Sequence, residues 1–139
     1  MIKNKKIFIT GGAGFIANKI IEKIIDKNKV VVYDNFSRDT LSNTKLKNHK
    51  NLKIIKGDIL NYTKLANSMK NSDIVVHAAA IAGIDTVIKN PVLTMKVNMI
   101  GTGNVLEAAK SNNIKDKFIE FSTSEIFGNY AYKSNEESN

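Results

Sequence analysis

The glycine cluster between residues 10 and 17 constrains the fold of this chain more than any other feature of the sequence. A short apolar run, Ile7–Ile9, precedes the cluster and is typical of a buried parallel strand. Apolar residues at helical spacing follow it and predict an amphipathic helix; they are Ile16, Ile20, Ile21, Ile24 and Ile25. A strand, a tight turn and a helix N-terminus together bind a pyrophosphate well, because free backbone N–H groups and the positive end of the helix dipole face the anion.

Each small residue of the cluster has a predicted role. Gly11 permits the turn, Gly14 lets the backbone approach a phosphate, and Ala17 lets the helix pack closely against the strand. Alanine is tolerated at the third position of this dinucleotide-binding pattern. A strand–turn–helix unit that binds no ligand would use similar residues, so the functional interpretation depends on the rest of the chain.

An acidic residue follows the second predicted strand at the spacing that dinucleotide-binding chains use. The strand Val30–Tyr33 ends at Asp34, about twenty residues after Gly14. A carboxylate at this place holds the adenosine ribose diol and repels a 2′-phosphate, which favours NAD over NADP. In the alternative interpretation Asp34 only caps a loop, and Arg38 lies near enough to leave NADP open as the cofactor.

Strands and helices alternate along the rest of the chain. Later strands are predicted at Leu52–Lys56, Asp73–His77 and Lys117–Phe121, helices at Tyr62–Met69 and Val92–Ser111, and loops at 35–51, with a short helix around 41–46, and at 81–90, where the loop could fold over a cofactor. The alternation predicts an α/β fold, a Rossmann-type doubly wound parallel sheet with strand order 3-2-1-4-5. Without a repeat or a linker, residues 1–139 are expected to form one NAD-binding domain, with its ligand crevice between the first and fourth strands.

Polar and small residues at the ends of the later strands extend the predicted ligand edge. Asp58 follows the third strand, where it can accept a hydrogen bond from an adenine amino group or cap the next helix, as Asn61 also can. Ala78–Ala80 follow the fourth strand and leave room for a flat ring or a phosphate. His77 lies among apolar neighbours, so we expect a structural histidine with satisfied hydrogen bonds rather than a catalytic one.

The long helix predicted after Pro91 carries two glycines and one asparagine of interest. Its apolar positions are Val97, Ile100, Val105 and Ala108. Gly101 and Gly103 each cost a helix about 1 kcal/mol relative to alanine, so they predict close packing, here against the sheet. Asn98 is either a buried polar anchor or a cofactor contact.

Composition bears on partners and compartment. The net charge of +8 permits a nucleic-acid interpretation, but the lysines are spread along the chain, and no zinc spacing or recognition helix accompanies them. The chain has no cysteine, no apolar run of membrane-spanning length and no signal peptide, so we expect a cytoplasmic protein that binds neither membrane nor nucleic acid. No metal site is expected either.

Several motifs, in family order, resemble the extended short-chain dehydrogenase/reductase family and, within it, the NAD-dependent sugar-nucleotide epimerases and dehydratases. They are Thr10–Ile16, Asp34–Asn35, Gly57–Asp58, His77–Ala80, Asn98 with Gly101–Thr102, and Ser122–Gly128. The resemblance implies that the pyrophosphate turn is formed by Gly11, Gly14 and Ala17, that Asp34 holds the ribose and that Asp58 meets adenine. It implies further NAD contacts at Phe15, Ile16, Asn35, Ile59, Ala78, Ala79, Ala80 and Asn98.

The same resemblance implies chemistry on a nucleotide sugar. In the family, NAD⁺ takes a hydride from sugar C4, the 4-keto sugar is epimerised, dehydrated or decarboxylated, and the hydride is usually returned. Thr123 falls on the catalytic Ser/Thr that hydrogen-bonds the 4-hydroxyl of the sugar. Glu125 falls where a glutamate acts as an acid or base in dehydratase and decarboxylase members.

The chain departs from the family at the proton-abstracting tyrosine, which belongs to a Tyr-x-x-x-Lys motif. None of the four tyrosines has a lysine four residues later; they are Tyr33, Tyr62, Tyr130 and Tyr132. In the family the motif and a C-terminal sugar-nucleotide domain come after the position of Thr123. We therefore expect these 139 residues to be the N-terminal portion of a longer enzyme, inactive alone and homo-oligomeric. A non-catalytic NAD(P)-binding module and a basic nucleic-acid binder remain as alternatives.

Overall fold

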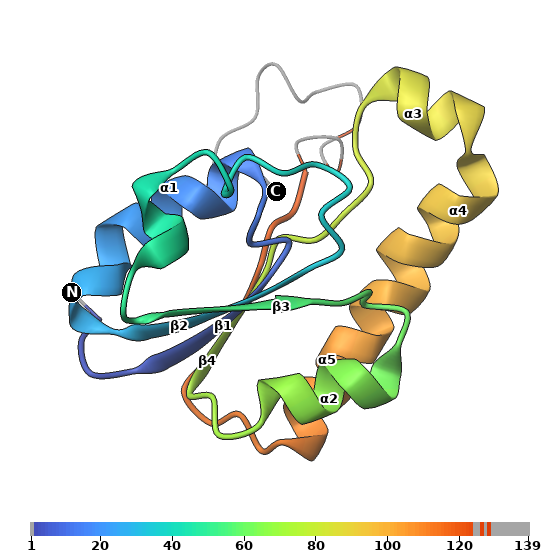
Figure 1. Cartoon of the computed structure of the whole chain (residues 1–139). Coiled ribbons are helices and arrows are strands. Elements are labelled where there is room, and N and C mark those ends of the chain that lie inside the picture. The colour runs from blue at the N-terminus through green and yellow to red at the C-terminus, as the bar shows by residue number, and fades with distance from the viewer. Residues whose placement is uncertain (1, 124–125, 127, 129–139) are drawn as a thin grey trace.

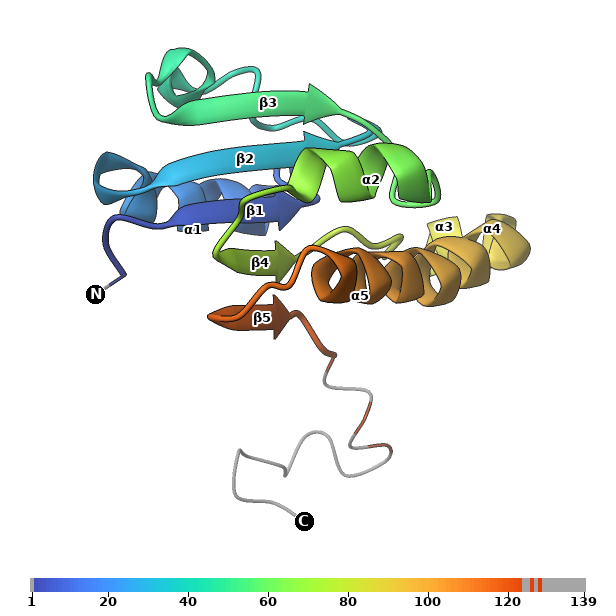
Figure 2. The same cartoon turned by 90° about the horizontal axis from the view of Figure 1, so that it is seen from below.

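Five parallel strands form one sheet in the computed structural model, which describes residues 2–123, 126 and 128. The order is β3-β2-β1-β4-β5, which confirms the predicted Rossmann topology, and the strand arrows in Figure 2 all point the same way. The strands are β1 (Lys6–Thr10), β2 (Lys29–Asp34), β3 (Leu52–Lys56), β4 (Ile74–His77) and β5 (Lys117–Glu120). From β1 to β3 successive strands are added on one side of β1, whereas β4 and β5 are added on its other side. The order of the strands therefore reverses between β1 and β4, and open α/β sheets bind their ligands at this switch point.

Helices cover both faces of the sheet. α1 lies on one face, and α2 and α5 lie on the other (Figures 1 and 2). The helical segments are α1 (Phe15–Ile24), the 3₁₀ turns η1 (Ile25–Lys27) and η2 (Lys45–Asn48), α2 (Tyr62–Met69), α3 (Ile84–Lys89), α4 (Pro91–Met95), the π-helical turn η3 (Lys96–Gly101) and α5 (Thr102–Ser111).

Two apolar cores follow from the alternation of side chains along the central strands. Ile7 and Ile9 pack on the α1 side, whereas Phe8 between them packs on the side of α2 and α5. Both faces are buried, which explains why the central strands are continuously apolar in sequence. The α1 core also contains Ala17, Ile21, Val30 and Val32, and the opposite core contains Tyr33, Leu65, Met69, Val105 and Ala108.

Local sequence signals set the bounds of α2. The helix spans the predicted residues, and Leu65 and Met69 are its fully buried side chains. Asn61 caps it, since Oδ1 of Asn61 accepts a hydrogen bond of 3.1 Å from the backbone N–H of Lys64. The side chain of Asn61, and not that of Asp58, therefore provides the cap.

The long helix begins at Pro91 as predicted, but it is not a uniform α-helix, because η3 interrupts it. A Cβ atom at Gly101 would lie 2.8 Å from Cγ1 of Ile59, so this glycine is closely packed, although against the connection after β3 and not against the sheet. The same expectation is wrong for Gly103, where a Cβ atom would meet nothing within 4 Å. Ile100 is 56% exposed, so this apolar position does not face the core.

Three other expectations about local structure are wrong. Ile16 does not belong to the buried face of α1, since its side chain is 57% exposed at the first turn. The short helical segment predicted at 41–46 is η2, displaced to Lys45–Asn48. The segment 81–90 is not only a loop, because it contains α3, which projects with α4 beyond the sheet (Figure 1). The apolar residues Ile84, Val87 and Ile88 have the i, i+3, i+4 spacing of a helix, which the sequence analysis did not use, and α3 buries none of them.

Candidate dinucleotide site

The turn after β1 is built around a backbone conformation that favours glycine. Gly11 has φ of +68°, and its C=O accepts the N–H of Gly14 at 3.0 Å. A Cβ atom at Gly11 would lie 2.5 Å from the backbone N of Ala79 and 2.6 Å from the carbonyl carbon of Ala78. Gly11 therefore allows the turn and also lets it touch the chain that leaves β4.

Gly14 has one close neighbour where a side chain would begin. It is the N-cap residue of α1 with φ of −75°, and a Cβ atom there would meet only the carbonyl oxygen of Gly11, at 3.2 Å. No side chain caps α1, so the N–H groups of its first turn lack a side-chain acceptor. Phe15 and Ile16 beside them are 71% and 57% exposed. Such a helix start offers an anion both hydrogen-bond donors and a favourable dipole.

The peptide groups of Ala13 fix the turn to the rest of the fold. Its N–H donates to Oδ2 of Asp34 at 2.9 Å, and its C=O accepts both the N–H and the Oγ1–H of Thr40 at 2.9 Å. Asn18 in turn donates from Nδ2 to Oγ1 of Thr40. These contacts within the chain hold the turn in shape. Sequence analysis missed Thr40 and Asn18, because neither belongs to a recognisable motif.

Asp34 ends β2 and is 9% exposed. Besides Ala13, it binds the N–H of Phe36, which donates to Oδ1 at 2.7 Å. Asp34 therefore does cap a loop, yet each carboxylate oxygen keeps a second lone pair for a further donor. Asn35 is exposed and accepts the N–H of Ser37. The guanidinium of Arg38 donates to the carbonyl of Ala82 at 3.0 Å, in the connection after β4.

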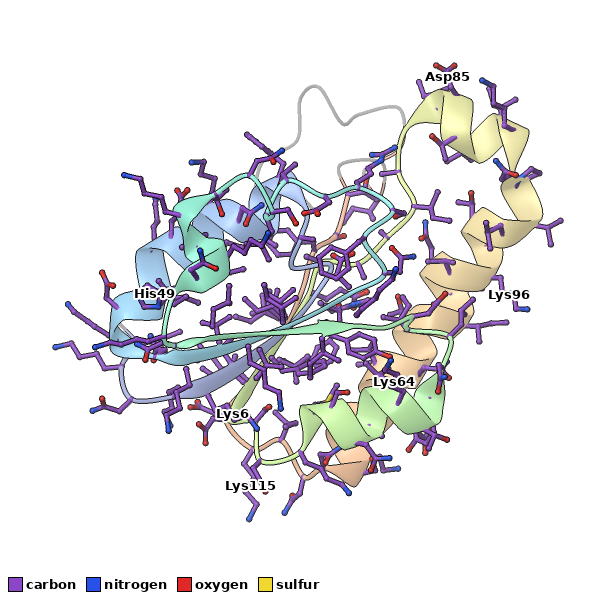
Figure 3. All side chains as sticks on the ribbon, viewed as in Figure 1. Lys6, His49, Lys64, Asp85, Lys96 and Lys115 are labelled. Carbon is purple, nitrogen blue, oxygen red and sulfur yellow. The ribbon has the colours of Figure 1, made fainter. Side chains whose placement is uncertain are left out.

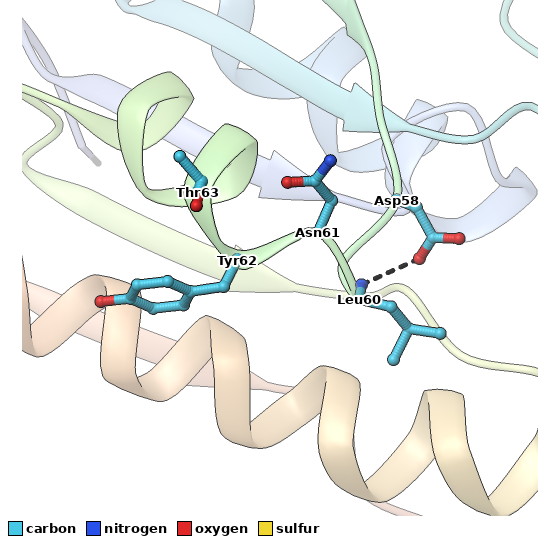
Figure 4. A pocket seen from close by; sticks show the side chains of 5 residues that line it. All are labelled: Asp58, Leu60, Asn61, Tyr62 and Thr63. Atoms are coloured by element: carbon cyan, nitrogen blue, oxygen red, sulfur yellow. Dashed lines mark hydrogen bonds between the residues drawn. The ribbon is translucent and has the colours of Figure 1, made fainter.

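Asp58 follows β3, where its exposed carboxylate accepts the N–H of Leu60 at 2.9 Å. Tyr33 fixes the backbone of the same residue, since its hydroxyl donates to the carbonyl of Asp58 at 3.0 Å. Burial raises the pKa of Tyr33 to about 12, so the hydroxyl stays protonated as a donor. Asp58 lines a surface pocket of about 500 Å³ with Leu60, Asn61, Tyr62 and Thr63 (Figure 4). Ile59, 5% exposed, is buried against Gly101.

The residues at the end of β4 are held by hydrogen bonds. Nδ1 and Nε2 of His77 lie 2.6 Å from Oγ1 of Thr10 and 2.9 Å from Oγ1 of Thr102, which confirms a structural histidine. The amide of Asn98 accepts the N–H of Ile81 at 2.8 Å and donates to its C=O at 2.9 Å. Of its two predicted roles, the geometry favours the polar anchor. After His77 the chain becomes progressively exposed through Ala78, Ala79 and Ala80.

The predicted catalytic residues follow β5. Thr123 is exposed, and its carbonyl oxygen accepts the N–H of Ile126 at 3.4 Å. Glu125 lies outside the described residues. Among the residues that the structure describes, no group of histidine and acidic side chains could hold a metal ion. In the same part of the chain, no helix has the length and apolar character needed to cross a membrane.

The positive charge is distributed over several elements. The labelled lysines in Figure 3 come from the start of β1 (Lys6), from α2 (Lys64), from η3 (Lys96) and from the connection before β5 (Lys115). Lys6 has a lowered pKa, chiefly because of partial burial and then because of the charge of Lys53. Lys5 instead forms an ion pair of 2.8 Å with Asp116.

Together, the parallel sheet, the glycine turn at the start of α1 and the acidic residue at the end of β2 define a Rossmann-type nucleotide-binding fold. The sequence profile of the NAD dependent epimerase/dehydratase family matches residues 7–139, and the chain belongs to this family.

Several similar proteins are named as enzymes of nucleotide sugars. The chain is 35% identical to a UDP-N-acetyl-alpha-D-glucosaminuronate decarboxylase of Bacillus cytotoxicus, covering 89% of this chain and 38% of that protein. It matches a UDP-N-acetylglucosamine 4-epimerase of Methanobrevibacter ruminantium, solved with UDP-N-acetylmuramic acid, with a TM-score of 0.86 and 33% identity over 99% of this chain and 44% of the other. The Bordetella bronchiseptica enzyme WbmH, solved with NAD⁺, gives a TM-score of 0.75 and 35% identity over 89% and 40%. The chain thus spans less than half the length of these proteins.

Proposed function

We propose that this chain is the NAD-binding portion, over residues 1–139, of an enzyme that acts on a nucleotide sugar by transient oxidation at sugar C4. The observation that carries the proposal is the uncapped start of α1 at Gly14, which lies beside a turn already fixed by Asp34. Relatives solved with NAD⁺ and with a UDP-sugar support the choice of cofactor and of substrate class.

In this proposal each part of the site binds one part of NAD. The N–H groups at the start of α1 bind the pyrophosphate, with Gly11 and Gly14 keeping the backbone close and Phe15 and Ile16 beside it. Asp34 accepts the ribose hydroxyls with its remaining lone pairs, next to Asn35. The adenine side is formed by Asp58 and Ile59, and Ala78, Ala79 and Ala80 line the crevice beyond β4, near Asn98.

Bound NAD supplies the hydride acceptor and donor for the sugar carbon. Thr123 would orient the sugar hydroxyl, and Glu125 would exchange a proton with the oxidised sugar. A threonine hydroxyl is too weak a base to accept the hydroxyl proton at neutral pH, so a separate activated base is required. The family supplies it from Tyr-x-x-x-Lys, which this sequence does not contain.

A second candidate function is a non-catalytic NAD(P)-binding module, because the uncapped start of α1 and the fixed turn would serve it equally well. The two candidates share the cofactor site and differ only in turnover. A nucleic-acid partner is disfavoured, because the lysines are spread along the chain and the labelled ones come from different elements (Figure 3).

Calorimetric titration with NAD⁺ and NADP⁺ tests the proposal. We expect tighter binding of NAD⁺, and we expect Asp34→Ala to weaken it. Asp39→Ala is the matched control, because Asp39 is an exposed carboxylate on the same connection whose Oδ1 accepts the N–H of Ser42. Equal affinity for both cofactors would overturn the assignment of NAD, and the lack of binding of either would overturn the cofactor site.

A further inference from the structure

A continuous series of hydrogen bonds runs across the carboxyl ends of β1 and β4. Oγ1 of Thr10 lies 2.6 Å from Nδ1 of His77, and Nε2 of His77 lies 2.9 Å from Oγ1 of Thr102. Thr102 donates to the carbonyl of Asn98 at 2.8 Å, and the amide of Asn98 binds both backbone groups of Ile81. The series therefore begins at the residue before the glycine turn and ends in the segment after β4.

The partners determine which nitrogen of His77 carries the proton. If Nε2 is protonated, Thr10 donates to Nδ1, Nε2–H donates to Thr102, and Thr102 remains free to donate to Asn98, so all three bonds form. If Nδ1 is protonated instead, Nε2 must accept from Thr102, which then cannot donate to Asn98. The hydroxyl proton of Thr10, a fully buried residue, would also lose its acceptor.

Burial disfavours the doubly protonated ring. His77 is 4% exposed, and burial lowers its pKa, with a smaller opposing effect of Glu120 beside it on β5. Thr10 and Thr102, which contact its two nitrogens, are uncharged. In a doubly protonated ring both nitrogens would donate, and Thr10 would again have no acceptor.

We propose that His77, as the neutral Nε2–H tautomer, is a positioning residue that couples the strand entering the glycine turn to Ile81. β1 and β4 form the two sides of the switch point, so the series fixes one side of the crevice relative to the other. The effect on cofactor affinity rests on the proposed function, whereas the coupling itself is a property of the chain.

Thr102→Val tests the coupling, because it keeps the shape of the side chain and removes its hydroxyl. We expect amide hydrogen exchange at the N–H of Ile81 to quicken by roughly 2- to 12-fold, the range for one hydrogen bond. Thr94→Val is the matched control. Thr94 is buried on the same long helix and makes the same bond, to the carbonyl of Asn90 at 2.9 Å, but it is not part of the series.

Two variants of His77 test the roles of its two ring nitrogens separately. A glutamine amide can replace the Nε2–H donor, so amide exchange at Ile81 should stay slow in His77→Gln. An asparagine amide reaches only the position of Nδ1, so amide exchange at Ile81 should become faster in His77→Asn. Nitrogen NMR of the wild-type imidazole should show a protonated Nε2 and an unprotonated Nδ1.

Cofactor titration links the series to the site. If the proposed function holds, Thr102→Val should weaken NAD⁺ binding by roughly 2- to 12-fold and Thr94→Val should not. A protonated Nδ1, or unchanged exchange of Ile81 in Thr102→Val, would overturn the coupling. A wild-type chain that binds no NAD⁺ but shows the expected tautomer and exchange would refute the proposed function and support the coupling.

Discussion

Replacement of Gly11 by alanine should destabilise the fold much more than an ordinary glycine substitution. The added methyl group would lie 2.5 Å from the backbone N of Ala79 and 2.6 Å from the carbonyl carbon of Ala78. Both are backbone atoms of the segment directly after β4, and they cannot move aside as the tip of a side chain can. The left-handed φ of +68° adds about 1–2 kcal/mol, and overpacking adds about 1–3 kcal/mol, so the expected loss is about 2–5 kcal/mol.

Urea denaturation followed by circular dichroism measures this loss. Gly103→Ala is the matched control, since the same methyl group there meets nothing within 4 Å and lies in α5. It should raise the free energy of unfolding by up to about 1 kcal/mol. A loss below about 1 kcal/mol for Gly11→Ala would contradict both the strain and the close approach to β4.

Three further predictions concern pH, assembly and turnover. Burial lowers the pKa of folded His77 while the unfolded chain keeps about 6.5, so below that pH the unfolded state binds more protons. The free energy of unfolding should then fall by up to about 1.4 kcal/mol per pH unit as the pH drops from 6.5 toward the folded pKa, and a pH-independent stability in urea titrations would refute this. Ile84, Ile88 and Val92 are 79%, 72% and 80% exposed, which favours self-association, so light scattering should show a dimer or larger species and not a monodisperse monomer. Without Tyr-x-x-x-Lys, the chain should leave UDP-, GDP- and dTDP-sugars unchanged, and a chromatographically detected product would contradict this.

Sequence alone predicted the sheet because each strand carries a local signal. Apolar β-branched runs end at glycine or at a polar residue, and alternation with helices leaves few topologies. α2 was equally predictable, since Asn61 is a good cap and Leu65 and Met69 lie one helical turn apart. The positions of Gly11, Gly14 and Asp34 were predictable because they follow, or end, the first two strands.

The remaining features depend on contacts between distant parts of the chain. The role of Gly101 arises from packing against Ile59, which no local period shows. The fixation of Ala13 by Thr40 and the binding of Ile81 by Asn98 join residues 27 and 17 positions apart. Sequence analysis identified Asn98 as polar and of interest, but only the structure shows what its amide binds.

Calorimetric titration of Gly14→Val with NAD⁺, beside the wild type, tests most directly that the glycine turn binds the pyrophosphate. At Gly14 the first added atom meets only the carbonyl oxygen of Gly11, at 3.2 Å, so the variant should remain folded, as urea denaturation would verify. Its branched side chain would occupy the place of the anion at the start of α1. The account predicts that the wild type binds NAD⁺ and that folded Gly14→Val does not, whereas normal NAD⁺ affinity in the variant would contradict it.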